Sequence, residues 1–167
     1  PRYLIFDSYG TLVEMDDFYG RLPAGFARLG CSLPLEVVKR AARHEMHHYM
    51  ARARFAADAA SWHALRDECA TVLAHAIREQ NFKLELPLES VGQLLSDSVV
   101  FRAFPHAKAT LEELKKRGMH LGVLSNWDFR LPVALEDTGL GHFFDFVLTS
   151  AQAGVEKPTR EFFEKGL

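Results

Sequence analysis

The sequence predicts an α/β protein whose parallel sheet is interrupted by an all-helical insertion. After Pro105, short apolar strand patterns alternate with helical segments. Before it, a block from residue 16 to about residue 98 shows helical periodicity and almost no strand signal. With 167 residues, 48% of them hydrophobic and 25% charged, the chain has the size of one core domain with one insertion.

The first strand pattern runs from Tyr3 to Phe6 and ends at Asp7. A nearly continuous apolar run of this length is typical of a buried parallel strand. In the block that follows, residues 35–57 and 61–80 have the periodicity of long helices. The second of them carries an apolar stripe, which indicates packing against another helix, at Trp62, Leu65, Cys69, Val72, Leu73 and Ala76.

The alternation that follows Pro105 predicts helices at residues 107–117, 131–138 and 160–165 and strands at residues 120–124 and 143–148. Strands separated by helices of this length imply right-handed crossovers and a parallel sheet. Such sheets bind ligands at the carboxyl ends of their strands, and Asp7, Ser125 and Lys157 all fall near that edge. We therefore expect a core made of residues 1–13 and 100–167, with a helical insertion at residues 14–99.

Charge and composition argue against several kinds of partner. A formal net charge of -2 and a pI near 6.5 provide no field that would attract nucleic acid or an anionic membrane surface. No apolar run approaches the roughly 20 residues that span a bilayer, and residues 1–6 pass into a strand pattern without a basic leader. We expect a cytoplasmic protein in which Cys31 and Cys69 are reduced packing residues.

Three motifs resemble the signatures of the haloacid dehalogenase (HAD) superfamily. The first is the segment at residues 6–12, which reads FDSYGTL; the second is LGVLSN at residues 121–126, and the third is GVEKP at residues 154–158. They occur in the family's order and with fitting intervals. The resemblance implies a HAD-like, Rossmann-like three-layer core with an all-helical cap inserted after the first strand.

The resemblance makes Asp7 the covalent nucleophile, and the residue types agree with that role. A carboxylate at a strand end can attack carbon or phosphorus and divide one difficult displacement into two steps. An anionic substrate would be repelled unless cations and donors neutralise it, which Lys157, Ser125, Asn126 and the Thr11 hydroxyl would do. Taken singly, a strand-end Asp that caps a turn and a surface Lys before a proline would be the simpler interpretation.

The second position after the nucleophile separates two reaction classes. Phosphatases of the superfamily usually carry Asp there to protonate the leaving oxygen, whereas this chain has Tyr9, and a phenol is a much weaker acid. 2-Haloacid dehalogenases carry DxYGT and expel halide, which needs no proton. The resemblance therefore favours a dehalogenase in which Ser125 and Asn126 bind the substrate carboxylate, Lys157 keeps Asp7 ionised and no cofactor is needed.

Other residues of the proposed site depend on weaker signals. The family uses a cap arginine to receive the halide, and Arg40 is the nearest positional match, with Arg43 as a competitor and a solvated helix residue as the simpler interpretation. Trp127 follows Ser125 and Asn126 directly, so it either walls the substrate pocket or packs in the core. The expected partner is a small anionic substrate, and an apolar cap face could support a homodimer.

Two alternatives stay open. The sequence around Trp127 is closer to phosphatase-like relatives, for which Mg²⁺ would bind between Asp7, the carbonyl of Tyr9 and a later acidic residue. The family's fourth signature is not found before Leu167, so we expect the C-terminal part of the core to be missing, and a non-catalytic binding protein is the third hypothesis. His44 and His48 share a helical face, which suits either a metal pair or a polar surface.

Overall fold

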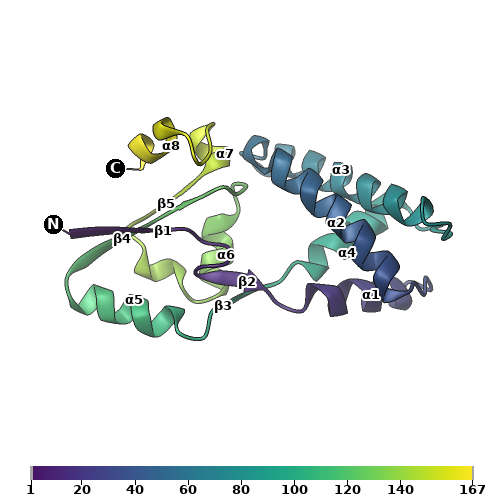
Figure 1. Cartoon of the computed structure of the whole chain (residues 1–167), viewed down its shortest axis with the longest axis horizontal. Helices are drawn as coiled ribbons and strands as arrows, with labels where there is room; N and C mark the ends of the chain where they lie inside the picture. Colours follow the sequence, from purple (N-terminus) through teal and green to yellow (C-terminus); the bar gives the residue numbers. More distant parts are fainter. Residues whose placement is uncertain (1, 167) are drawn as a thin grey trace. The chain divides into compact units, whose positions relative to one another are not determined.

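The computed structural model describes residues 2–166 and groups them into two compact units. The core unit combines residues 2–15, the short segment Ala53–Asp58 and residues 101–166. The helical unit combines Asp16–Arg52 with Ala59–Val100. Figure 1 shows the chain coloured along its sequence, and each unit is described separately below.

The core unit contains the expected parallel sheet. Its strands are β1 (Arg2–Phe6), β4 (Met119–Ser125) and β5 (Phe146–Thr149), in the order β1-β4-β5. β4 is central, and its register pairs Phe6 with Val123 on one side and Ser125 with Thr149 on the other. All three carboxyl ends therefore meet at one edge of the sheet.

The helices of the core unit cover both faces of this sheet (Figure 1). α5 (Ala107–Lys116) and α6 (Leu131–Asp137) lie on one face, followed by the 3-10 turn η2 (Gly141–Phe143). The short helices α7 (Ser150–Ala153) and α8 (Arg160–Lys165) lie on the other. This three-layer arrangement confirms the predicted α/β fold.

Side chains of β4 point alternately to the two faces of the sheet, so this strand packs against helices on both sides. Leu121 and Val123 are fully buried in the cluster that includes Leu111 of α5. Leu124 points the other way, toward the end of α8, where its side chain lies near Gly166. Gly122 leaves room for the ring of Phe146, since an added Cβ would stand 2.3 Å from that ring.

The prediction that the first strand is buried was wrong. Tyr3 is 61% exposed, and Leu4 and Ile5 are each 38% exposed. Among the described residues β1 pairs with β4 alone, and its apolar composition agrees with the preference of such residues for strands. Phe6, the last residue of β1, packs against the core cluster.

A second, antiparallel ribbon joins β2 (Val13–Met15) to β3 (Phe101–Ala103). The sequence did not predict either strand, because three residues are too few to display a period. The ribbon lies where the chain leaves the core unit and where it returns, since the helical unit begins at Asp16 and ends at Val100.

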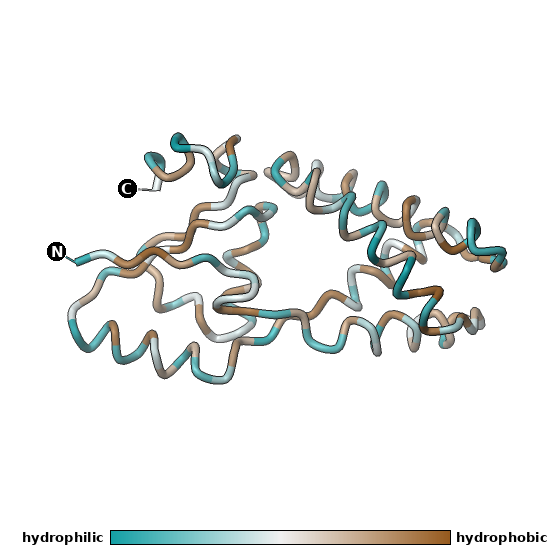
Figure 2. The backbone as a smooth tube through the Cα atoms, in the orientation of Figure 1, coloured by the Kyte–Doolittle hydropathy of each residue, from teal (hydrophilic) through white to brown (hydrophobic). Residues whose placement is uncertain are grey.

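The helical unit consists of α1 (Phe18–Arg28), α2 (Leu35–Arg52), α3 (Ala59–Arg78) and α4 (Leu88–Ser98). Apolar and polar residues alternate along these helices with the helical period (Figure 2). Four residues of the stripe predicted on α3 are buried, namely Leu65, Cys69, Leu73 and Ala76, whereas Trp62 and Val72 are only partly buried. Ala70, Ala74 and Ile77 of the same helix are buried as well. Across the described residues, no helix is both long and apolar enough to cross a membrane.

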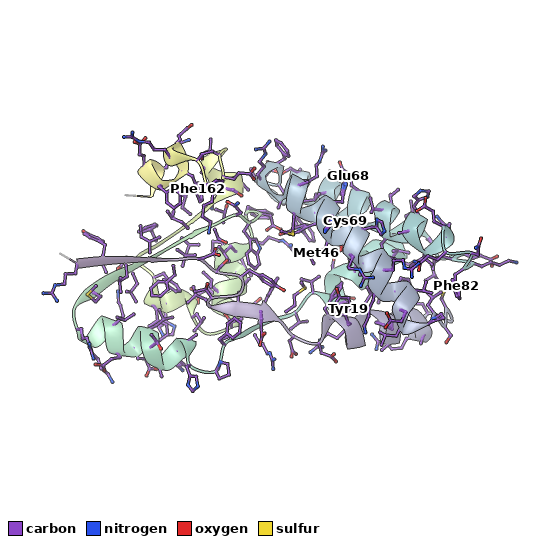
Figure 3. All side chains as sticks on the ribbon, in the orientation of Figure 1. Tyr19, Met46, Glu68, Cys69, Phe82 and Phe162 are labelled. Atoms are coloured by element: carbon purple, nitrogen blue, oxygen red, sulfur yellow. The ribbon has the colours of Figure 1, made fainter. Side chains whose placement is uncertain are left out.

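One ionisable side chain is buried inside the helical unit. Glu45 of α2 is 5% exposed and contacts Cys69 of α3, which is 3% exposed and labelled in Figure 3. Burial raises the pKa of Glu45 to about 7, although the Cys69 hydrogen bond and nearby His48 oppose the shift. Burial, followed by the Glu45 charge, also raises the pKa of the Cys69 thiol. Both cysteines are free, as expected.

The segment Ala53–Asp58 departs from the expected domain bounds. We expected one helix over residues 35–57 within the insertion, but α2 ends at Arg52, and Ala53–Phe55 form the 3-10 turn η1. This segment packs with the core unit, where Ala53 and Ala56 are buried. The chain therefore passes between the units four times rather than twice.

Candidate active site

Asp7 is the first residue after β1, at the edge where the three carboxyl ends meet. Because Phe6 pairs with Val123, Asp7 lies level with the last residues of β4, and Ser125 comes within hydrogen-bonding distance. The sequence predicted that these two side chains would share the edge. The Asp7 side chain is 49% exposed, so it is accessible from solvent.

Three donors converge on one oxygen of the Asp7 carboxylate. Oδ1 accepts the Ser8 backbone N–H at 2.9 Å, the Ser125 hydroxyl at 3.2 Å and the Lys157 ammonium at 2.7 Å. Within the described residues, no donor is recorded on Oδ2. Donors to one oxygen fix the rotamer of a carboxylate and leave the other oxygen available for attack.

Lys157 is held in place through its backbone as well as its side chain. The Asn126 side-chain amide makes two hydrogen bonds to the Lys157 backbone. Its Oδ1 accepts the Lys157 N–H at 2.8 Å, and its Nδ2 donates to the Lys157 carbonyl at 3.1 Å. Asn126 was predicted to bind substrate, but in the structure both of its amide atoms join two loops of the active edge. Its role toward a substrate stays a prediction.

Ser8 is a residue that sequence reasoning missed. It is fully buried, and its hydroxyl lies 2.7 Å from the Ser125 hydroxyl. Its carbonyl accepts the N–H groups of Thr11, Leu12 and Val13 and so forms the turn after β1. This turn requires a positive φ of 78° at Gly10, which glycine adopts without strain. Ser8 stands beside the predicted nucleophile, so its position in the motif was the available signal.

The turn leaves Thr11 and Tyr9 exposed at the active edge. The Tyr9 ring is 49% exposed and meets the edge of the Trp127 ring at 6.3 Å. Trp127 is only 5% exposed and belongs to the core cluster, with the ring of Phe101 at 5.0 Å. Trp127 therefore packs in the core, and its ring contacts the exposed Tyr9 ring.

Asp128 and Arg130 form a second feature that the sequence analysis overlooked. Asp128 is fully buried, and its carboxylate accepts the Arg130 N–H at 2.8 Å and the Arg130 guanidinium at 2.9 Å. A buried carboxylate is costly unless it is paired in this way. The pair shapes the loop after Ser125, and the tendency of Asp to bond the N–H two residues later was the signal for it.

A third missed feature connects the segment 53–58 to the active edge. The Arg54 guanidinium bonds Glu156 at 3.1 Å, and the Ala56 carbonyl accepts the Phe129 N–H at 3.0 Å. Glu156 precedes Lys157 directly. No local pattern could have shown that a residue within the helical half of the sequence would pack in the core.

Arg40 lies on the exposed surface of α2 in the helical unit, as does its competitor Arg43. The role of Arg40 as a halide-binding residue stays a prediction. In the same unit, His48 bonds Glu68 at 2.9 Å. The described part of the chain has no group of three or more His, Cys, Asp and Glu side chains placed to hold a metal ion.

A half-exposed aspartate that bonds a lysine lies at the carboxyl edge of a parallel sheet, the edge at which ligands bind in α/β proteins. The family model for haloacid dehalogenase-like hydrolases matches residues 1–167. The chain therefore belongs to the haloacid dehalogenase-like hydrolase family.

Relatives of both reaction classes resemble the chain. It is 51% identical over 79 residues to haloacid dehalogenase-like hydrolase domain-containing protein 3 of Bos taurus, which covers 47% of this chain and 32% of that protein. It is 38% identical over 89 residues to glyceraldehyde 3-phosphate phosphatase of Methanothermobacter thermautotrophicus, which covers 48% and 37%.

Among solved structures, the L-2-haloacid dehalogenase of Xanthobacter autotrophicus superposes with a TM-score of 0.64. The match covers 99% of this chain and 63% of that enzyme at 20% identity, so it supports the fold alone. The chain matches about a third of the length of the two curated relatives and about two thirds of the dehalogenase.

Proposed function

We propose that this hydrolase cleaves the carbon–halogen bond of a small 2-haloacid through a covalent intermediate on Asp7. The observation that supports it most directly is the arrangement around the carboxylate. Three donors hold Oδ1, and Lys157 among them balances the charge, while Oδ2 is left to attack. A carboxylate placed in this way is oriented before the substrate arrives, which lowers the entropic part of the barrier.

In the first step, Oδ2 of Asp7 attacks the α-carbon, the carbon–halogen bond breaks, and halide leaves with the bonding electron pair. In the second step, water attacks the carbonyl carbon of the aspartyl ester. The Asp7 carboxylate is regenerated, and a 2-hydroxyacid and a proton are released. Lys157 and the hydroxyl of Ser125 lie where they would stabilise negative charge on the Asp7 carboxyl group as it forms again.

The groups near Asp7 favour a leaving group that needs no proton. The two neighbouring carboxylates are already committed to ion pairs, Asp128 to Arg130 at 2.9 Å and Glu156 to Arg54 at 3.1 Å. Tyr9 occupies the position from which related phosphatases protonate the leaving oxygen, and a phenol is a weak acid for that task. Halide departs without this help.

A Mg²⁺-dependent small-molecule phosphatase is the second candidate, and the similarity to glyceraldehyde 3-phosphate phosphatase favours it. Here the Asp7 carboxylate, the Tyr9 carbonyl and a later acidic residue would hold Mg²⁺, a cation that prefers oxygen ligands. The ion would neutralise charge on the phosphate.

One pair of assays separates these candidates. The protein is tested for halide release from 2-chloropropionate and for phosphate release from p-nitrophenyl phosphate, each with Mg²⁺ and with EDTA. We expect halide release that survives EDTA. Phosphate release that depends on Mg²⁺ would replace the first proposal by the second, and inactivity on both substrates would count against each of them.

The first prediction concerns the nucleophile itself. Asp7→Asn keeps the size of the side chain and removes its charge, so we expect turnover of the active substrate to fall by roughly 10³-fold or more. Asp145→Asn is the matched control, because Asp145 is also a partly exposed carboxylate of the core unit with a lysine partner. Unchanged turnover in Asp7→Asn would exclude the covalent mechanism.

A further inference from the structure

The segment Ala53–Asp58 touches both loops that carry the candidate active site. Its Ala56 carbonyl accepts the Phe129 N–H at 3.0 Å, in the loop that follows Ser125. Its Arg54 guanidinium bonds Glu156 at 3.1 Å, in the loop that carries Lys157. The segment therefore joins two loops that lie about 30 residues apart in the sequence and that both supply groups to Asp7.

A short series of contacts leads from Arg54 to the nucleophile. Arg54 holds Glu156, whose backbone continues directly into Lys157. The Lys157 backbone is fixed on its other side by the two Asn126 bonds at 2.8 and 3.1 Å. The Lys157 ammonium then reaches Asp7 at 2.7 Å. Lys157 is thus held between Asn126 and the Glu156–Arg54 pair.

The Arg54 side chain is fixed more firmly than a surface arginine. Its guanidinium carbon lies 4.6 Å from the centre of the Phe55 ring, and its Nε is buried with no hydrogen-bond partner in the described part of the chain. The Arg54 and Glu156 side chains are still 40% and 36% exposed. An ion pair with that exposure contributes little to the stability of the fold. We therefore expect it to affect where the neighbouring groups lie.

We propose that Arg54 is a positioning residue, which acts through Glu156 to hold the Lys157 ammonium against Asp7. This inference rests on the proposed function, because it assumes that Lys157 serves Asp7 in catalysis. Arg54 lies between α2 and α3, which both belong to the helical unit. The part of the sequence that forms the helical unit therefore also contributes a residue that holds the active edge of the core unit.

The test replaces Arg54 by Gln and reads the state of Lys157 directly. Lysine amines are labelled competitively with acetic anhydride, and the labelled fraction at Lys157 is measured by peptide mass spectrometry. Acylation requires an amine that is free to meet the reagent, and the Lys157 amine is held against the Asp7 carboxylate at 2.7 Å. We expect labelling of Lys157 to rise roughly three- to tenfold in Arg54→Gln, because the ammonium loses its fixed place beside Asp7.

Arg160→Gln is the matched control. Arg160 belongs to the same unit, lies three residues from Lys157 and forms an ion pair of 2.6 Å with Glu164, but it is 91% exposed and contacts none of the site residues. Its loss should leave Lys157 labelling unchanged. If Arg54→Gln and Arg160→Gln behave alike, Arg54 has no positioning role.

Further variants test whether Arg54 positions Lys157 or only stabilises the fold. Glu156→Gln should also raise the labelling of Lys157. The double variant should be labelled only slightly more than either single variant, because both substitutions break the same ion pair. Arg54→Lys keeps the charge and should restore part of the protection. Equal thermal unfolding of Arg54→Gln and Arg160→Gln will show that the effect is local, and additive effects of Arg54→Gln and Glu156→Gln would contradict the proposal.

Activity gives the second measurement. Misplacing a catalytic group by about 1 Å can cost roughly 10²-fold, so we expect kcat of Arg54→Gln to fall roughly 10- to 100-fold with KM nearly unchanged. Labelling does not depend on any substrate. If the unaltered protein proves inactive on both assay substrates while Arg54→Gln still exposes Lys157, the proposed function fails and the positioning role stands.

Discussion

The core unit and the helical unit use polar side chains in opposite ways. In the core unit, charged and hydroxyl groups collect on the loops at one edge of the sheet, where Lys157 and Ser125 converge on a half-exposed Asp7. In the helical unit, the buried polar side chains among the described residues are Glu45 and Ser98. The core unit thus gathers polar groups around an exposed carboxylate, whereas the helical unit buries one whose ionisation makes stability depend on pH.

Lys157→Met should have the largest effect, and it acts on chemistry alone. The variant keeps the length of the side chain and removes the cation that balances Asp7, so we expect kcat/KM to fall roughly 10³-fold. The Asp7 side chain is 49% exposed, and an ion pair open to solvent contributes little to stability, so urea unfolding should show little change. Lys165→Met, which removes a more exposed lysine, is the control. If Lys157→Met loses much of its stability but keeps its activity, Lys157 serves the fold and not the chemistry.

Leu73→Ala should cost about 3 kcal/mol of stability, because Leu73 of α3 is fully buried and its loss leaves a cavity. Urea unfolding, followed by far-ultraviolet circular dichroism, measures the change. Val72→Ala on the same helix, where the side chain is only half-buried, should cost less than half as much. Equal costs at the two positions would show that the apolar stripe does not hold the helical unit together.

Glu45→Gln should change how stability depends on pH. The folded-state pKa of Glu45 is raised from 4.5 to about 7, so the folded protein binds more protons than the unfolded chain between these values. Stability due to the neutral carboxyl is present below about pH 4.5 and is lost as pH rises to about 7. At about 1.4 kcal/mol per pKa unit, the loss is on the order of 3–4 kcal/mol. Gln, which never ionises, should flatten this part of the curve.

Unfolding in urea at several values between pH 5 and pH 8 measures this dependence. Glu36→Gln is the control, because Glu36 lies on the same helix with its side chain 76% exposed. Cys69 and His48 act on the Glu45 carboxyl, and Glu68 acts on Cys69 in turn. If the Glu45→Gln and Glu36→Gln curves have the same slope, Glu45 is not the group responsible.

The sequence predicted the sheet and the central contact of the site, because both depend on local signals. Asp7 and Ser125 each end an apolar strand, and strands joined by helical crossovers bring such ends to one edge. The same topology placed Lys157 near that edge, but only the resemblance to a family linked its side chain to Asp7. Its contact with Asp7 at 2.7 Å spans 150 residues and has no periodic signature.

The remaining features could not be predicted for reasons that differ from case to case. β2 and β3 have three residues each, too few to show alternation. The exposure of Tyr3 was missed because an apolar edge strand and a buried strand have the same composition. Arg54 follows a long helical pattern, and only the packing of Ala53 and Ala56 on the core unit reveals that the pattern ends there.

The four passages of the chain between the two units affect how this protein can be re-engineered. An insertion held by one ribbon could be exchanged as a cassette, by cutting after Met15 and before Phe101. In this chain, such an exchange would also remove Ala56 and Arg54, which the core unit uses for its own loops. A working chimera would have to keep residues 53–58 and replace the two helical stretches around them as separate pieces.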